Sequence, residues 1–176
     1  MNPLQPWADY FVAQAGASAA LAGLIFVVLS FNFDHIVSDR TWLGRAGTGL
    51  VLLVQPMLYG LVGLFGARTA RPAAWSLVVV AAAAIAALIR ITLTTTESDA
   101  EHPVPDLARR LGFVMAASVL QLGGALALVA GWSDGTYFLA VGSLLSLLIG
   151  LMIAWILLVE VRRLKGFGAE PPPPGS

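Results

Sequence analysis

Five long runs of apolar and small residues, separated by short polar connections, make up most of the chain. The first run, at about 8–31, reads ADYFVAQAGASAALAGLIFVVLSF and contains one charged residue, Asp9. The others lie at about 46–67, 73–96, 111–132 and 136–161. At about 1.5 Å rise per residue, runs of this length cross the roughly 30 Å hydrocarbon layer of a bilayer as α-helices. The pattern predicts an all-α, polytopic transmembrane bundle of five helices.

The connections define how these helices follow one another. The turn Ser133-Asp134-Gly135 is so short that the fourth and fifth helices must form an antiparallel hairpin. We expect a single transmembrane domain over 1–165 and a flexible, proline-rich tail over 166–176, which ends in PPPPGS. The first run is too long, and lacks the preceding basic residues, for a signal peptide. We therefore expect it to be retained.

Composition supports a lipid environment. Of the 176 residues, 58% are hydrophobic and 11% are charged, whereas soluble domains carry about 25% charged residues. Ten basic and ten acidic residues cancel, and the chain has no basic patch that would favour nucleic acid. Cysteine is absent, which excludes disulfides and thiolate metal ligands. The expected surroundings are membrane lipid, and the expected location is a plasma (inner) membrane.

Basic residues are distributed unevenly between the two sides of a five-helix topology. The positive-inside rule places the side richer in Arg and Lys in the cytoplasm. We therefore expect the N-terminus outside and the C-terminus in the cytoplasm, with Trp7, Trp75 and Trp132 at the outer interface and Trp42 and Trp155 near the inner one. The richer side holds Arg40, Arg45, Arg109, Arg110, Arg162, Arg163 and Lys165, and the poorer side holds Arg68 and Arg71.

Small residues at four-residue intervals are the strongest signal of helix packing. In lipid, helices associate through close backbone contact, which small side chains permit. Packing within one bundle and an interface between subunits are both compatible with these stripes. The candidate packing residues are Gly142, Ser146, Gly150 and Ala154 on the fifth helix, and Ala15, Ala19 and Gly23 on the first, with Gly16 and Ala20 on its next face.

Gln14, Gln55 and Gln121 are uncharged polar residues placed at membrane depth. Each must find a hydrogen-bond partner inside the bundle, because lipid offers none. They either join helices, at roughly 0.6–2 kcal/mol per contact, or line a polar path for a solute or ion. Pro56, next to Gln55, removes one backbone hydrogen bond from its helix.

Arg90 is the one basic residue that falls inside a predicted span. A charge at the bilayer centre costs at least about 2.5–3.5 kcal/mol, so such residues often mark function. Arg90 lies in the last third of its span, from where its side chain can reach the interface. It is either an interfacial anchor, with the acidic 97–106 loop nearby, or a member of the candidate polar path.

Residue patterns of known enzymes are missing from the sequence. There is no HExxH motif, no intramembrane aspartate pair, no GxSx-type serine with a histidine partner and no glycine-rich phosphate loop. The two histidines, His35 and His102, fall in connections, which disfavours a haem held between helices. We expect no catalytic activity, no metal and no cofactor.

The first span has an aromatic lead, an Ala/Gly-rich middle and a phenylalanine-rich exit followed by asparagine. The residues concerned are Trp7, Tyr10 and Phe11, then Gly16–Gly23, then Phe26, Ser30 and Asn32. In these features it resembles the first span of a family of small bacterial integral membrane proteins. Some members of that family carry the label of modulators of a membrane-bound AAA protease, which implies a regulatory binding partner and no catalysis.

Two functions follow as hypotheses. The first is a non-catalytic membrane protein that acts by helix–helix association, as an accessory or regulatory subunit of a larger membrane assembly. The alternative is a homo-oligomeric ion or small-solute channel, in which Gln14, Gln55, Gln121 and Arg90 face a shared path. A lipid or small-molecule carrier has less support.

Overall fold

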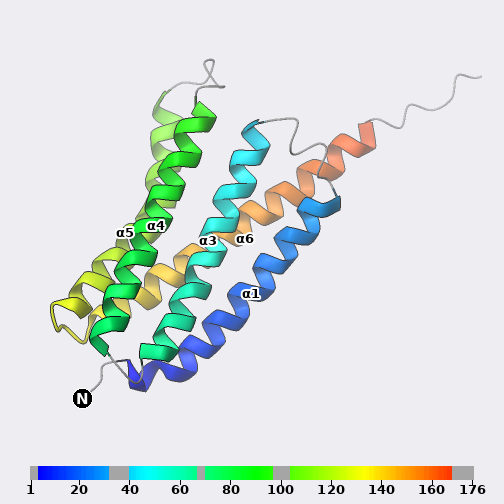
Figure 1. Ribbon diagram of the computed structural model, residues 1–176. Helices are drawn as coiled ribbons and strands as arrows, with labels where there is room; N and C mark the ends of the chain where they lie inside the picture. The colour runs from blue at the N-terminus through cyan, green and yellow to red at the C-terminus, as the bar shows by residue number, and fades with distance from the viewer. Residues whose placement is uncertain (1–3, 32–39, 67–69, 97–103, 168–176) are drawn as a thin grey trace, which may run out of the picture.

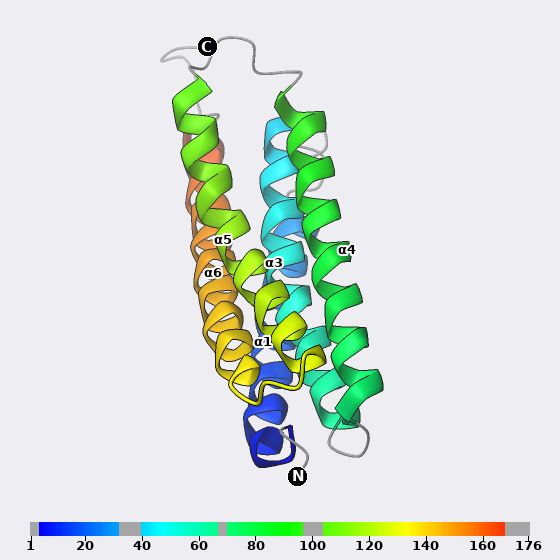
Figure 2. The ribbon, with the colours of Figure 1, turned by 90° about the vertical axis from the view of Figure 1, so that its left-hand side faces the viewer.

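The computed structural model describes residues 4–31, 40–66, 70–96 and 104–167, and their regular structure is entirely helical. The helices run alternately up and down, so that the first described helix begins and the last one ends at opposite ends of the bundle (Figures 1 and 2). The all-α prediction is confirmed. The elements are the short 3-10 helix η1 (Gln5–Trp7) and the α-helices α1 (Ala8–Phe31), α3 (Arg40–Gly66), α4 (Ala70–Thr96), α5 (Val104–Val129) and α6 (Gly135–Phe167).

Four of these helices are long and apolar enough to cross a membrane, which supports a multi-pass membrane protein. The apolar part of α5 that the structure describes is shorter, at Val114–Val129. The four candidate spans are Gln5–Phe31, Trp42–Gly66, Arg71–Thr94 and Gly135–Val159.

The bounds of α1 match the predicted run of 8–31, and the other helices differ at their ends. α3 and α4 begin earlier than predicted, at Arg40 and Ala70, and α6 continues to Phe167. Polar and basic residues extend these helices because helical backbone bonds do not stop at the edge of an apolar run. The predicted tail beyond 167 and most of the acidic loop lie outside the described residues.

α5 ends before the predicted limit of 132 because the chain turns at Gly131. Its φ of +87° lies in the left-handed region that favours glycine at a helix end. The Trp132 amide donates to the Ala127 carbonyl (2.9 Å) and the Gly131 amide to the Leu128 carbonyl (3.0 Å). α6 starts at Gly135, so α5 and α6 form the antiparallel hairpin that the short turn predicts.

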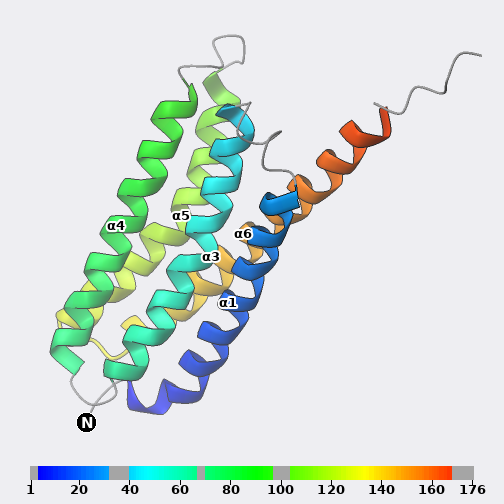
Figure 3. The same cartoon turned by 45° about the vertical axis from the view of Figure 1, so that its right-hand side comes forward.

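α3 is the central helix of the bundle. It packs against α1, α4 and α6, while α5 packs against α4 and α6. α1 contacts α3 and, less extensively, α6, so much of its circumference faces outward (Figure 3). The core between the helices is built from aliphatic side chains together with Phe11 and Tyr59; the most deeply buried aliphatic ones include Leu52, Leu53, Leu77, Leu88 and Leu157.

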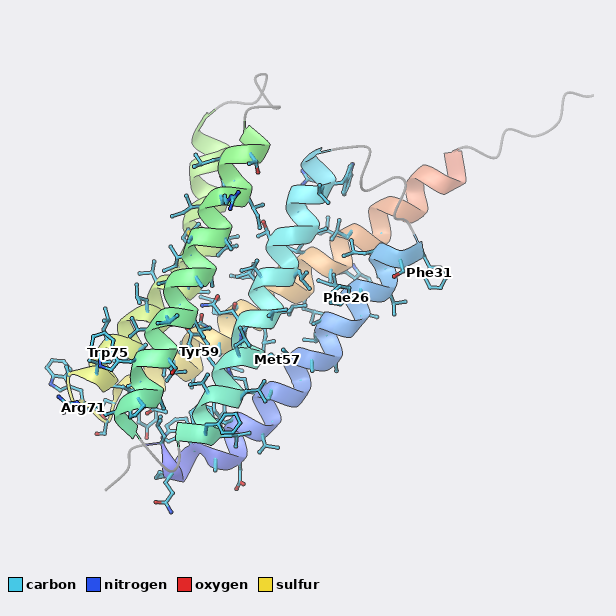
Figure 4. All side chains as sticks on the ribbon, viewed as in Figure 1. Phe26, Phe31, Met57, Tyr59, Arg71 and Trp75 are labelled. Atoms are coloured by element: carbon cyan, nitrogen blue, oxygen red, sulfur yellow. The ribbon has the colours of Figure 1, made fainter. Side chains whose placement is uncertain are left out.

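The outer surface carries large apolar side chains, as a bundle surrounded by lipid requires. Phe26 and Phe31 on α1 are 54% and 75% exposed, and Figure 4 shows them on the outside of that helix. At the opposite end of the bundle, Trp75 is 54% exposed near Arg71 at the start of α4 (Figure 4). Aromatic residues at such positions are typical of a membrane–water interface.

Candidate functional site

Gln14, Gln55 and Gln121 come together inside one chain. They project from α1, α3 and α5 and are 5%, 2% and 0% exposed. Burial of an amide in an apolar interior is costly unless its donors and acceptors are paired. The three glutamines and five hydroxyl side chains around them form the interior polar cluster. Those five residues are Tyr10, Tyr59, Ser118, Ser143 and Ser146.

Ser143 of α6 is shared by two of the amides. Gln14 Nε2 donates to Ser143 Oγ at 3.1 Å, and Gln121 Nε2 donates to the same oxygen at 3.2 Å. One serine hydroxyl therefore joins α1 and α5 to α6. Because these contacts cross between helices, they fix how the three helices are rotated against one another.

Gln55 is paired at both ends of its amide. Ser118 Oγ of α5 donates to Gln55 Oε1 at 3.0 Å, and Gln55 Nε2 donates to the Tyr59 hydroxyl, one turn along α3, at 3.4 Å. Tyr59 is 1% exposed and packs with the apolar residues between α3 and α4; Figure 4 shows it within the bundle. Gln55 therefore serves as a joint between α3 and α5.

Pro56 lies inside α3 and leaves a backbone carbonyl to be satisfied from elsewhere. Proline has no N–H, so the carbonyl of Leu52, four residues earlier, loses its usual donor. Ser146 Oγ of α6 donates to that carbonyl oxygen at 2.9 Å. Gln14 Nε2 of α1 donates to the Pro56 carbonyl at 2.7 Å. Side chains of two neighbouring helices thus bind the backbone around the proline.

Two amide oxygens of the cluster remain without a donor. Gln14 Oε1 and Gln121 Oε1 are buried, and neither accepts a hydrogen bond from any residue that the structure describes. Tyr10, at the edge of the cluster, donates from its hydroxyl to the Ala140 carbonyl at 3.2 Å. The cluster is therefore rich in acceptors that face no donor.

Arg90, the fourth member of the predicted polar path, lies apart from the glutamines. It is exposed on α4, whereas the three amides are enclosed by the bundle. The structure therefore does not gather the four residues into one path. The acidic residues of 97–103, proposed as partners of Arg90, lie outside the described residues.

The four packing residues of α6 are all buried within their own chain: Gly142, Ser146, Gly150 and Ala154. A Cβ on Gly142 would lie 2.6 Å from Gln121 Cγ, and one on Gly150 would lie 2.7 Å from Leu53 Cδ2. Both distances are shorter than side-chain atoms tolerate, so glycine permits these approaches. This stripe packs α6 against α5 and α3.

The candidate residues of α1 divide between two surroundings. Ala15 is partly buried and lies against Gly60 of α3, where an added Cβ would be 2.9 Å from Ala15 Cβ. Ala19 and Gly23 are exposed, and a Cβ on Gly23 would meet nothing within 4 Å. Gly16 and Ala20 on the same side of the helix are also exposed. We call these four residues the small outer face of α1: Gly16, Ala19, Ala20 and Gly23.

Sequence reasoning missed the serines that organise the cluster. Ser118 and Ser143 lie among apolar residues of α5 and α6, and serine is common in such helices as a packing residue. The one signal was position: Ser143 stands three residues before Ser146, on the same side of α6. Ser146 was predicted as a packing residue, and its hydroxyl adds the bond to Leu52.

Comparisons with known proteins give no relative from which a role can be transferred. No family model, curated protein or solved structure matches the chain. Among the described residues, no three His, Cys, Asp or Glu side chains are grouped to hold a metal ion. The functional proposal is therefore argued from the bundle itself.

Proposed function

We propose that this chain is a five-helix protein of the bacterial inner membrane that works without catalysis, by helix–helix association, as an accessory or regulatory subunit of a larger membrane assembly. The single observation that carries the proposal is the small outer face of α1. Its four residues are exposed, and neither Gly16 nor Gly23 has a neighbouring side chain or backbone within 4 Å of an added Cβ.

Glycine inside a helix has a cost, which is about 0.8–1.0 kcal/mol relative to alanine. In this bundle the buried glycines offset that cost by allowing close approach: a Cβ added at Gly60 would lie 2.7 Å from the Phe11 carbonyl oxygen. Among the described residues, Gly16 and Gly23 bring no such contact. A helix of a second protein, packed closely on this face, would give these residues the role that small residues have elsewhere in membranes.

The partner that this face suits is a transmembrane helix. Contact through small residues is short-range and apolar, and it requires the two backbones to approach within the bilayer. A helix of a different membrane protein is the partner that an accessory or regulatory subunit requires. A second copy of the chain is the other source of such a helix.

We place the N-terminus outside and the C-terminus in the cytoplasm, and we count α5 as a full span, the fourth of five in chain order. α5 follows the length of its neighbours α4 and α6 in Figure 2, and the distribution of arginine and lysine supports this orientation. Because the chain has no cysteine, single introduced thiols report position without a background. A membrane-impermeant reagent should label Ser133→Cys in intact cells but Lys165→Cys only after permeabilisation; the opposite pattern would contradict the orientation.

Extraction into native nanodiscs, without detergent, tests the association. We expect the purified particle to contain either another membrane protein or more than one copy of this chain. Its mass and composition, measured by native mass spectrometry, decide the matter. A particle that contains a single copy and lipid alone would contradict the proposal.

The homo-oligomeric channel has no specific observation in its favour. A shared path needs polar residues on the outer surface of each subunit. Gln14, Gln55 and Gln121 are instead enclosed by helices of their own chain, and Arg90 faces outward from α4. Ion flux through liposomes that depends on Gln55 would restore that alternative.

A further inference from the structure

The direction of each hydrogen bond around Ser143 can be assigned from the groups involved. The Tyr10 hydroxyl gives its hydrogen to the Ala140 carbonyl. An amide N–H donates and a hydroxyl oxygen accepts, so Ser143 Oγ accepts from Gln14 Nε2 and from Gln121 Nε2.

The Pro56 carbonyl fixes the orientation of the Gln14 amide. Exchanging the nitrogen and oxygen of Gln14 would place its oxygen against that carbonyl, which has no hydrogen to give. Gln121 donates from Nε2 to Ser143 Oγ at 3.2 Å. Gln14 Oε1 and Gln121 Oε1 are therefore acceptors that no described residue supplies.

We propose that Gln14 Oε1 and Gln121 Oε1, beside Ser143, form a binding site for one small uncharged hydrogen-bond donor of water's size. Two acceptors on neighbouring amides match the two hydrogens that one water donates. Leaving a buried polar atom unpaired is costly, and its cost is removed by a single bridging molecule.

Charge and space both limit what this site accepts. The buried polar groups that the structure describes belong to glutamines, serines, one threonine and Tyr59, and they include no carboxylate to balance a cation. A bare charge in such surroundings is unfavourable. Gln121 is 0% exposed, and its Cγ would be only 2.6 Å from a Cβ on Gly142. A small neutral donor meets both limits.

Selective labelling of glutamine with ¹⁵N tests the proposal on the full chain in lipid nanodiscs. The labelled side chains are Gln5, Gln14, Gln55 and Gln121. Gln5 is exposed and serves as the positive control for contact with water. Gln55, buried and paired at both ends, is the matched interior control. Each signal is assigned by its loss in a Gln→Met variant.

We expect nuclear Overhauser cross-peaks between water and the side-chain amides of Gln14 and Gln121, with the sign of a long-lived bound molecule. Gln55 should show none. Absence of the peak at either Gln14 or Gln121 would overturn the shared site. Peaks of equal intensity at all three buried glutamines would overturn it as well, because they would indicate general access of water.

Ser143→Ala distinguishes two sources of a water cross-peak at Gln14. The peak can come from a bound water, or from the serine hydroxyl proton as it exchanges with water. Gln14 keeps its bond to the Pro56 carbonyl in this variant, so its oxygen stays unpaired and its water peak should persist. Disappearance of that peak would show that the signal passed through the hydroxyl proton and would overturn the proposal.

Salts test the neutral character of the ligand. The melting temperature of the wild-type chain should be the same in potassium, sodium, ammonium and choline chloride at equal ionic strength. A ligand that binds only the folded state stabilises it by RT ln(1 + [L]/Kd), so the melting temperature rises with the ligand concentration. A rise with potassium, sodium or ammonium that Gln14→Met abolishes would overturn the proposal in favour of a cation site.

Discussion

The glycines of α3 and those on the outer side of α1 have opposite surroundings. At Gly60 and Gly63 of α3, an added Cβ would lie 2.7 Å from the Phe11 carbonyl oxygen and 2.6 Å from the Phe11 ring. At Gly16 and Gly23 of α1 it would meet nothing within 4 Å. Residues of the same type therefore pack helices together inside the bundle in one place and lie on its outer surface in the other. The comparison separates the contacts that hold the five helices together from the surface through which we propose that the chain binds another helix.

Gly60→Val tests the inner half of this comparison and should have the largest effect. The new side chain would push α1 away from α3, and overpacking of this kind costs about 1–3 kcal/mol or more. Gly23→Val, on the outer face, is the matched control and should leave stability unchanged. Thermal unfolding in detergent measures both. Equal stability of the two variants would contradict the close contact between α1 and α3.

Ser146→Ala should have the next largest effect, because it removes the donor to the Leu52 carbonyl. An unpaired buried carbonyl costs about 1–3 kcal/mol, and contacts between membrane helices average nearer 0.6 kcal/mol. The expected loss of unfolding free energy is therefore about 1 kcal/mol.

Pro56→Ala supplies the control for the hydrogen bond between Ser146 and the Leu52 carbonyl. Alanine restores an N–H that donates to Leu52 within α3, so Ser146→Ala should cost less in that background. A double-mutant cycle measures the difference. An unchanged cost would show that Ser146 contributes by packing and not by satisfying the carbonyl.

Arg90→Ala should have the smallest effect. Arg90 is exposed on α4, away from the polar cluster, and surface substitutions usually stay within about 0.5 kcal/mol. Unfolding free energy and particle mass should both match the wild type. A lost partner, or a large change in stability, would show that Arg90 belongs to a functional contact.

Hydropathy was sufficient to predict the helices, because the thickness of the bilayer sets the length of the apolar run that a spanning helix needs. α1 has the predicted bounds of Ala8–Phe31, and the turn at Ser133–Gly135 produces the predicted hairpin. The ends of α3 and α6 were predicted less well, since Arg40 and the residues up to Phe167 continue their helices through polar sequence.

The rotation of each helix could not be predicted in the same way. In a membrane helix, apolar residues cover both the buried and the outward side, so periodicity does not reveal which side faces the neighbours. Ala15 and Ala19 belonged to one predicted stripe, yet the first is partly buried and the second exposed. The meeting of Gln14 and Gln121 at Ser143 depends on these rotations.

The central claim, association through the small outer face of α1, is tested most directly by comparing two leucine variants for partner binding. Gly16→Leu with Gly23→Leu fills that face, whereas Gly123→Leu adds bulk to α5 at another exposed glycine with nothing within 4 Å. The measurement is the mass and composition of native nanodisc particles of each. We expect Gly16→Leu/Gly23→Leu to lose the partner chain and Gly123→Leu to retain it. Retention of the partner by a folded Gly16→Leu/Gly23→Leu variant would contradict the account.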